Sequence, residues 1–394
     1  MIILVINSGS SSLKYQVRDT GKDAKTPVLT EGIVERIGIE GSGYTHEDHI
    51  VGTENEVTTE IPDHAVAFDL IYKEIQKTIG DIEIEAVGHR VVHGGETFSA
   101  PVAIDKKVAD EIDALSPLAP LHNPANVLGI RVILEKFPKM PQVAVFDTAF
   151  HATLPEHAYR YALPNEMYKK YGIRRYGFHG TSHDYVSKQA AKFLEVDDKD
   201  FDGVIAHVGN GASLSAVKGG ESIDTSMGFT PLAGLVMGTR TGDIDPSILI
   251  FLAREGYDAD QLDDLVNKKS GYLGLNGESD MRSLVEKVDA GDKEATLALE
   301  IGTYNLAKFI GSYHVAVGGM KALVFTAGVG ENSAPFRAKT VEKLSALGIK
   351  LDEQKNDERS KEIRNIAAED SKIPVLVIPT DEELAIAQAV EATV

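Results

Sequence analysis

The first seventeen residues combine two apolar segments with a polar turn between them. Ile2–Ile6 is a run of five apolar residues that leads through Asn7 into Gly and Ser residues, after which an alternating pattern begins. This pattern predicts a strand, a tight loop and a return strand. Gly9 would let the backbone approach an anion, and the Ser hydroxyls and Lys14 offer donors and a positive charge. The Walker A spacing GxxxxGK[ST] is absent, so the segment is not a P-loop. Two interpretations remain: a hairpin that binds phosphate, or a hairpin in which Gly and Ser only form the turn.

The same order of residue types returns in the second half of the chain. Val204–Val217 is an apolar run, a Gly and Asn turn and an alternating segment, and Asn210 lies about half of the 394-residue length after Asn7. Two similar hairpins favour a duplicated architecture in which two units face one ligand across a cleft.

The apolar spacing predicts the remaining elements, and Pro155 after a short polar segment favours a boundary between the halves near residues 148–155. The expected strands are Val28–Ile39, Val57–Ile61, Ala86–Val92, Gln142–Asp147, Leu323–Phe325 and Ile373–Ile378, and the expected helices are His64–Ile79, Pro246–Glu255, Ala259–Asn267 and Lys293–Val317. Thr380 or Asp381 is expected to cap a last helix, and Ser333 with Pro335 marks another helix start. The amphipathic segment Lys293–Val317 would either be buried or face a second subunit.

Composition narrows the possible partners and location. The net charge is −20, so the average surface would repel the phosphate backbone of a nucleic acid. The absence of cysteine excludes disulfides and a thiolate nucleophile, and no apolar run approaches the ~18 residues of a membrane span. We therefore expect a soluble cytoplasmic protein that binds neither nucleic acid nor membrane.

Two arginines lie in turns and not on charged helix faces. Arg90 is in GHRVVHGGE and Arg240 is in GTRTGD. A guanidinium matches carboxylate and phosphoryl oxygens in bidentate geometry, so the two arginines indicate an anion that is neutralised during group transfer. A structural salt bridge for each arginine is the alternative.

Four other polar residues are candidates for the same chemistry. Asp147 follows an apolar strand, and ligands of open α/β sheets bind beyond the carboxyl ends of strands. His179 lies in a Gly-flanked turn and would either reach a reacting oxygen or only stabilise the turn, whereas His183 is expected at a helix start. Asn7 and Glu382 could support a hydrated Mg²⁺, although Glu382 also suits the first turn of a helix for its charge alone.

Eight segments spread over the whole chain together resemble the acetate kinase family. They are NSGSSSLKY, GHRVVHGGETF, FDTAFH, RRYGFHGTSH, HVGNGASL, MGTRTGDIDP, FTAGVGEN and PTDEEL. The resemblance implies an α/β fold of the actin and hexokinase type, with two duplicated ribonuclease H-like domains whose mixed sheets flank an interdomain cleft. It also implies a homodimer, an N-terminal actin-like domain at 1–150 completed by the C-terminal helix 381–394, and a C-terminal, nucleotide-binding actin-like domain at 151–380.

The same resemblance implies a reaction and its residues. The reaction is the reversible, Mg²⁺-dependent transfer of the ATP γ-phosphoryl group to acetate, giving acetyl phosphate and ADP by direct in-line transfer, with Mn²⁺ as a substitute metal. Arg90 and Arg240 would clamp acetate and the phosphoryl group, His179 would donate to that group, Asp147 and Asn7 would organise metal and phosphate, and Glu382 would support the metal. The implied methyl pocket is Val92, Leu121, Phe178 and Pro231. The implied nucleotide-binding residues are Ser10, Ser12, Lys14, His207, Val208, Gly209, Asn210, Gly211, Asp280, Met281, Arg282, Gly328, Val329, Gly330, Glu331 and Asn332.

The chemistry of a carboxylate acceptor agrees with these residues. With a solution pKa of about 4 to 5 the acceptor is already ionised at neutral pH, so it needs relief from charge repulsion and no general base. Asp147 is therefore expected to act through position and metal organisation. Two alternatives stay open: a kinase for propionate or another short-chain acid, since one methylene is worth only about 1–3 kcal/mol, and an ATP-dependent conformational switch of the same fold.

Overall fold

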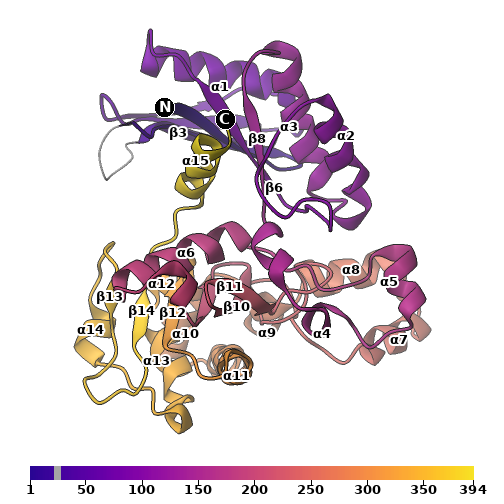
Figure 1. Cartoon of the computed structure of the whole chain (residues 1–394). Coiled ribbons are helices and arrows are strands. Elements are labelled where there is room, and N and C mark those ends of the chain that lie inside the picture. The colour runs from indigo at the N-terminus through magenta and orange to yellow at the C-terminus, as the bar shows by residue number, and fades with distance from the viewer. Residues whose placement is uncertain (22–27) are drawn as a thin grey trace. The chain divides into compact units, whose positions relative to one another are not determined.

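The computed structural model describes residues 1–21 and 28–394, which form two compact units (Figure 1). Unit 1 contains Met1–Phe150 together with Asp381–Val394, and unit 2 contains His151–Thr380. The last fourteen residues thus belong to the same unit as the amino terminus.

Among its described residues, unit 1 has one mixed sheet with the strand order β5-β4-β3-β2-β1-β6-β8-β7. The strands are β1 (Ile2–Ser8), β2 (Ser12–Asp19), β3 (Val28–Glu35), β4 (Gly43–Asp48), β5 (Thr53–Thr58), β6 (Ala86–Val91), β7 (Val102–Ala103) and β8 (Gln142–Phe146). The helices are α1 (His64–Ile79), α2 (Lys106–Ala114), α3 (Asn123–Lys136) and α15 (Glu382–Thr393), with a 3₁₀ turn at Ser116–Leu118.

The central strand β1 is buried on both faces, which explains its continuous apolar run. Leu4 and Ile6 point into a core shared with α1, whereas Ile3 and Val5 point to the opposite face, against α15. Successive side chains of a strand alternate between faces, so Asn7 continues the α15 face beyond Val5. The polar end of β1 is therefore on the side of the sheet that α15 covers.

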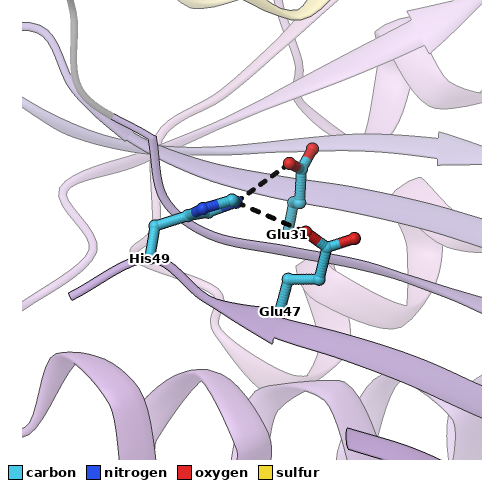
Figure 2. Close-up of side chains that lie close together, drawn as sticks. All are labelled: Glu31, Glu47 and His49. Atoms are coloured by element: carbon cyan, nitrogen blue, oxygen red, sulfur yellow. Dashed lines mark hydrogen bonds and ion pairs between the residues drawn. The ribbon is translucent and has the colours of Figure 1, made fainter. Parts of the chain in front are cut away.

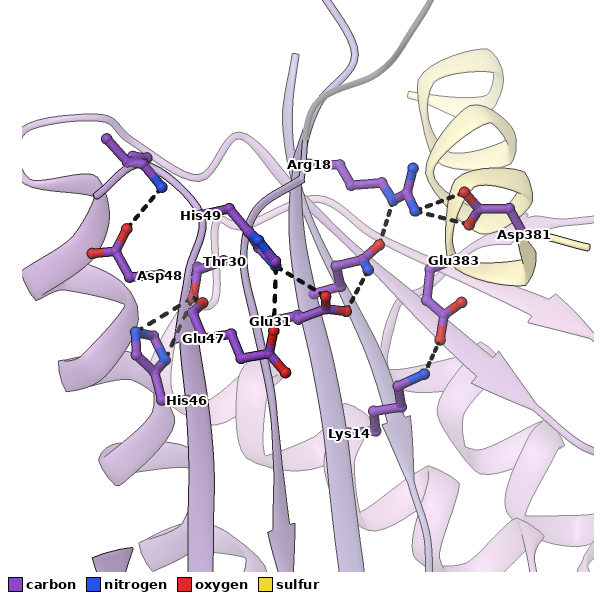
Figure 3. Close-up of polar contacts among 12 residues, drawn as sticks. Lys14, Arg18, Thr30, Glu31, His46, Glu47, Asp48, His49, Asp381 and Glu383 are labelled. Atoms are coloured by element: carbon purple, nitrogen blue, oxygen red, sulfur yellow. Dashed lines mark hydrogen bonds and ion pairs between the residues drawn. The ribbon is translucent and has the colours of Figure 1, made fainter. Parts of the chain in front are cut away.

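Helix α15 is held on this face by close packing and by ion pairs. A Cβ at Gly88 of β6 would lie 2.6 Å from Ile386 Cγ2, so only glycine allows this approach. Asp381 caps the helix, as expected. Arg18 Nη2 also donates to both carboxylate oxygens of Asp381, each at 2.8 Å (Figure 3). These contacts fix the first turn of α15 beside β2.

Unit 2 has a second mixed sheet with the strand order β11-β10-β9-β12-β14-β13. Its strands are β9 (Gly203–Val208), β10 (Ala212–Lys218), β11 (Glu221–Thr225), β12 (Ala322–Thr326), β13 (Arg364–Asn365) and β14 (Val375–Val377). Its helices are α4 (Glu156–Tyr159), α5 (Asn165–Tyr171), α6 (Gly180–Phe193), α7 (Ser247–Arg254), α8 (Ala259–Lys268), α9 (Gly271–Asn276), α10 (Met281–Asp289), α11 (Lys293–Val317), α12 (Ala327–Asn332), α13 (Ala334–Glu342) and α14 (Glu353–Asp357). Short 3₁₀ turns span Asp198–Asp200 and Ser345–Leu347, and a further one, Ala149–Thr153, crosses the boundary between the two units.

The two sheets share a five-strand topology. In unit 1, β3, β2 and β1 pair antiparallel, and β1, β6 and β8 pair parallel; in unit 2, β11, β10 and β9 pair antiparallel, and β9, β12 and β14 pair parallel. The β1–β2 and β9–β10 hairpins occupy equivalent places. The prediction of a duplicated α/β fold is confirmed.

Several element predictions need correction. The expected strand Val28–Ile39 ends at Glu35, because Arg36 adopts the left-handed conformation with φ 58°. The expected strand Val57–Ile61 is displaced: β5 covers Thr53–Thr58 and then ends. Strand β4 was not predicted, since its polar sequence GYTHED gives no apolar run.

Among the described residues, no helix has both the length and the apolar character needed to cross a membrane.

Candidate active site

Arg90 and Asp147 come from neighbouring parallel strands of unit 1. Arg90 is in β6, and Asp147 directly follows β8, which pairs with β6. Arg90 Nε lies 3.0 Å from Asp147 Oδ1, and Nη2 lies 2.7 Å from Oδ2, a bidentate pair. The attraction of Asp147 is the largest cause that raises the pKa of Arg90. Nη1 of Arg90 makes no hydrogen bond to the described residues, so this nitrogen of the guanidinium is available to an anion.

The α15 face of this sheet carries a small cavity of about 20 Å³. Its polar lining is Asn7, Lys14, Arg90, Glu382 and Glu383. A cavity of this size holds roughly one water molecule or one small ion. Four residues expected in the site from the sequence therefore meet at one place within unit 1.

The charges around this cavity are closely balanced. Lys14 Nζ lies 2.6 Å from Glu383 Oε1 (Figure 3). Burial is the largest influence on Glu383 and would raise its pKa, but the ion pair with Lys14 outweighs it and the pKa is lowered. The pKa of Glu382 is raised, first by burial and then by the like charges of Asp147 and Glu383, against the attraction of Arg90. A carboxylate in this position would be stabilised by an additional cation.

The donor set of this cavity fits Mg²⁺. Asn7 offers an amide oxygen and Glu382 a carboxylate, and Mg²⁺ is commonly held by one or two such ligands with several waters and substrate phosphates. Burial is the largest cause of the raised pKa of Glu382, so a cation bound beside it would favour its ionised form.

A different group of possible ligands lies on β3 and β4. Glu31, Glu47 and His49 each place one ligand atom within 4.8 Å of the others. Figure 2 shows the His49 ring directed at the two carboxylates. His49 Nε2 lies 2.9 Å from Glu31 Oε1, and the second carboxylate oxygen of Glu31 accepts a bond of 2.8 Å from Gln16. The group is partly exposed and forms an ion-pair network, with His49 Nε2 also 3.9 Å from Glu47 Oε2, so it is explained without a metal ion.

The hairpin of unit 2 is formed by residues 208–211 between β9 and β10. Gly209 N–H donates to Gly211 O at 3.0 Å, and Asn210 is exposed at the tip. In unit 1 the corresponding turn is closed by Gly9 N–H, which donates to Ser12 O at 2.8 Å, with Ser10 exposed. The backbone of both turns is thus accessible to a ligand.

His179 is placed against the hairpin of unit 2 by its backbone and its ring contacts. It is the residue before α6 and adopts the left-handed conformation with φ 57°. Its ring stacks on that of His207, with centroids 4.1 Å apart, and its Nδ1 lies 2.9 Å from Ser213 Oγ on β10. A non-glycine residue in this conformation is strained, and such residues are concentrated at functional sites.

Arg240 reaches the same hairpin through the loop that follows Pro231. Gly238 N–H donates to Asn210 O at 2.9 Å, and a Cβ at Gly238 would overlap the Asn210 side chain. Nη1 of Arg240 donates to Pro231 O at 3.0 Å, and burial lowers the pKa of the guanidinium. A Cβ built on Gly211 would lie 3.6 Å from His179 Nε2 and 3.7 Å from Arg240 Nη1. The two donors therefore lie on the same side of the turn.

The expected nucleoside-binding residues are placed in unit 2 but have structural roles as well. Asp280 caps α10, with its carboxylate accepting from Arg282 N–H at 3.0 Å. Met281 is buried, and the Arg282 side chain is 90% exposed. These contacts give Asp280 and Met281 a place in the fold that does not depend on a nucleotide.

The expected nucleotide-binding residues 328–332 lie in helix α12, which directly precedes the helix capped by Ser333. Ser333 caps α13, as predicted. Within α12, Glu331 Oε1 accepts from Ala327 N–H at 2.8 Å and from Thr380 N–H at 3.1 Å. These two bonds favour this helical turn. Gly328 has open space around its Cβ position, so its backbone is accessible.

The residues of the expected methyl pocket differ in exposure. Val92 in unit 1 and Phe178 in unit 2 are buried, at 8% and 3%, and Pro231 is partly buried. Leu121 in unit 1 is 66% exposed. Val92 and Leu121 thus belong to unit 1, whereas Phe178 and Pro231 belong to unit 2.

Sequence reasoning missed a group of buried polar side chains behind His179. His183 was expected at a helix start, but α6 begins at Gly180 and His183 is fully buried, with Nε2 2.8 Å from Ser213 Oγ. Ser182 Oγ contacts His207 Nδ1 at 2.8 Å. The one signal in the sequence was the alternation of Ser213 and Ser215 with apolar residues in a strand otherwise suited to a core.

The fold and these residues define a class of protein. The duplicated sheets, the two accessible hairpins and the arginines beside acidic and histidine side chains are those of a phosphotransferase that handles small anions.

Comparisons with known proteins give the particular family. The chain belongs to the acetokinase family, whose model matches residues 2–388. It is 60% identical to an acetate kinase of Arthrobacter sp. (strain FB24) over 394 residues, covering 100% of this chain and 99% of that protein. A crystal structure of Porphyromonas gingivalis acetate kinase has a TM-score of 0.94 and 43% identity and covers 99% of each chain. A propionate kinase structure from Francisella tularensis has a TM-score of 0.93 and 42% identity over 100% of both chains.

Proposed function

We propose that this enzyme transfers the γ-phosphoryl group of ATP to acetate by direct in-line displacement, reversibly, giving acetyl phosphate and ADP. The observation that carries the proposal is the fixed guanidinium in each unit, set beside an accessible hairpin, in a member of the acetokinase family. The proposal assigns residues of both units to one reaction. ATP as substrate also supports a cytoplasmic location as part of the proposal.

In the proposed reaction, Arg90 binds the acceptor carboxylate. Asp147 holds Nε and Nη2 of Arg90, so the guanidinium is fixed before a ligand arrives and only Nη1 faces a new anion. Acetate is already ionised at neutral pH, and its oxygen attacks without losing a proton. Asp147 therefore acts by holding Arg90, and its carboxylate need not accept a proton from the substrate.

Arg240 and His179 act on the phosphoryl group. Pro231 O anchors Nη1 of Arg240, and the stack on His207 fixes the ring of His179. Negative charge on the phosphoryl oxygens is stabilised by fixed donors, which need no reorganisation during the transfer. The Gly209–Gly211 backbone is the proposed support of the ATP phosphates, with Ser10, Ser12 and Lys14 on the hairpin of unit 1.

Asn7 and Glu382 are the proposed metal ligands. Mg²⁺ bound there would reduce the charge repulsion between the phosphates and the acceptor. Asp147 contributes a negative charge to the same environment, as its effect on the Glu382 pKa indicates.

Propionate is a second candidate acceptor, because a structure at 42% identity bears the name propionate kinase. The test is acyl phosphate formation, trapped as hydroxamate, from MgATP with acids of two, three and four carbons. We expect kcat/KM to be greatest for acetate, about 10-fold lower for propionate and about 100-fold lower for butyrate, since each added methylene must be accommodated in the acceptor pocket. A higher kcat/KM for propionate would favour the second candidate, and ADP formation that does not depend on any acid would contradict both.

Replacing Glu382 by Gln is expected to stabilise the enzyme at neutral pH while impairing catalysis about 10- to 100-fold. The raised pKa of Glu382 means that the folded state holds its proton more tightly than the unfolded state does. Ionising Glu382 therefore costs stability above its folded pKa, and this cost disappears as the pH falls towards the ordinary value of 4.5. The gain in Tm of the variant should be present at pH 7.5 and vanish near pH 4.5.

Glu391→Gln is the matched control, since Glu391 is exposed on the same helix. Mg²⁺ should raise the Tm of the wild type more than that of Glu382→Gln. A variant that is less stable than the wild type at pH 7.5 in the absence of metal would contradict the charge assignment.

A homodimer is the proposed assembly, and α7 is its proposed contact. No residue of α7 is buried, and Ile248, Ile250 and Phe251 are 45%, 55% and 61% exposed. An apolar helix with no buried residue is typical of an interface.

A further inference from the structure

Ser213 links two histidines in a fully buried position. Its Oγ lies 2.9 Å from His179 Nδ1 and 2.8 Å from His183 Nε2. Ser213 and His183 are both 0% exposed, so solvent does not compete for these bonds. A serine hydroxyl has a single proton and can donate to only one of the two rings.

The direction of the two bonds follows from the other nitrogen of His183. Burial lowers the pKa of His183 well below 6.5, and the ring is neutral with one N–H. Its Nδ1 is buried and has no hydrogen-bond partner. Orphaned buried N–H donors are rarer than unsatisfied acceptors, so the proton belongs on Nε2, which donates to Ser213.

Ser213 then donates its own proton to His179 Nδ1. A neutral ring that accepts at Nδ1 carries its proton on Nε2. This is the nitrogen that lies with Arg240 Nη1 beside Gly211.

We propose that His183 and Ser213 are positioning residues that hold neutral His179 as its Nε2–H tautomer, so that the ring presents a donor and not a lone pair to the phosphoryl oxygens. The proposal rests on the proposed role of His179 in transfer. The other tautomer would direct a lone pair at developing negative charge, which would destabilise the transition state.

The test combines NMR of the resting enzyme with kinetics. In protein labelled with ¹⁵N in its histidine rings, two-bond ¹H–¹⁵N correlations identify the tautomer, and His179 is assigned by its loss in His179→Gln. We expect a protonated Nε2 and an unprotonated Nδ1 in the wild type at pH 7.5. In Ser213→Ala we expect a substantial Nδ1–H population and a fall in kcat of about 10- to 100-fold, with KM values within about 3-fold. Ser213→Thr, which keeps a hydroxyl, should recover the Nε2–H tautomer.

Ser215→Ala is the matched control. Ser215 is on the same strand, two residues away and equally buried, and its hydroxyl lies 3.2 Å from Ser222 Oγ. It should retain the wild-type tautomer of His179 and a kcat within about 2-fold.

Three results would overturn the inference. One is a wild-type His179 that is Nδ1–H or doubly protonated; another is a Ser213→Ala variant whose tautomer is unchanged although its kcat falls. The third is full activity of His179→Gln. His179 would then have no role in the transfer, although the NMR experiment would still identify its tautomer. The last outcome separates failure of the proposed role of His179 from failure of the hydrogen-bond direction.

Discussion

Replacing Arg240 by alanine should lower kcat/KM for acyl phosphate formation about 10³-fold, which corresponds to about 4 kcal/mol of transition-state stabilisation. Arg240 is anchored by Pro231 O and lies beside His179 at the Gly211 turn. Its charge is already partly desolvated, as the lowered pKa indicates, so little free energy is lost in removing water when an anion binds. We expect a comparable loss for Arg90→Ala.

Lysine variants sharpen this prediction. Arg90→Lys keeps the charge but cannot grip both oxygens of Asp147 and also face a ligand, so it should recover less than one-tenth of the wild-type activity. Arg131→Ala and Arg359→Ala are controls, because the first arginine forms exposed ion pairs and the second is exposed. Rates for Arg90→Ala and Arg240→Ala that match these controls would refute the assignment of both arginines.

Replacing Asp147 by asparagine should lower kcat about 10²- to 10³-fold without changing the shape of the pH–rate profile. The variant loses the charge that holds two nitrogens of Arg90, and the guanidinium becomes mobile or turns away. Loss of the charge-assisted bonds should also reduce stability by about 2 kcal/mol. The measurement is the rate of hydroxamate formation between pH 6 and 9, together with urea unfolding.

Asp110→Asn provides the comparison for Asp147→Asn, since Asp110 also pairs with an arginine but at an exposed site. It should leave rate and stability almost unchanged. If high pH or added base restored the activity of Asp147→Asn, Asp147 would be a general base and the positioning role would be wrong.

The sequence was sufficient for the elements whose pattern is set by burial. Helix α1 coincides with the predicted His64–Ile79 and α11 with Lys293–Val317, because their apolar residues recur at helical spacing and both have an Asp cap. The outer strands β4 and β5 were missed or displaced because they are rich in charged and polar residues and little buried, which leaves no periodic signal.

The candidate site was predictable where residues follow strands and loops in order. Asn7, Arg90 and Glu382 meet at one cavity because strands β1 and β6 are neighbours and α15 covers them. The partners that tune these groups were not predictable. Lys14 pairs with Glu383, 369 residues away, and Ser213 meets two histidines of another element, and neither contact has a local sequence signature.

The return of α15 to the amino-terminal sheet has a consequence for how the chain is made. Ile386 and Val390 complete a cluster with Ile3 and Val5, yet the whole of unit 2 lies between these two pairs along the chain. On the ribosome, residues 1–150 keep one face of their sheet uncovered until α15 has been translated, while the intervening unit can fold earlier. Since Glu382 arrives on the same helix, a nascent or prematurely terminated polypeptide lacks both this hydrophobic cover and a proposed metal ligand. Unfinished chains would thus be inactive and marked for removal by the apolar surface they expose.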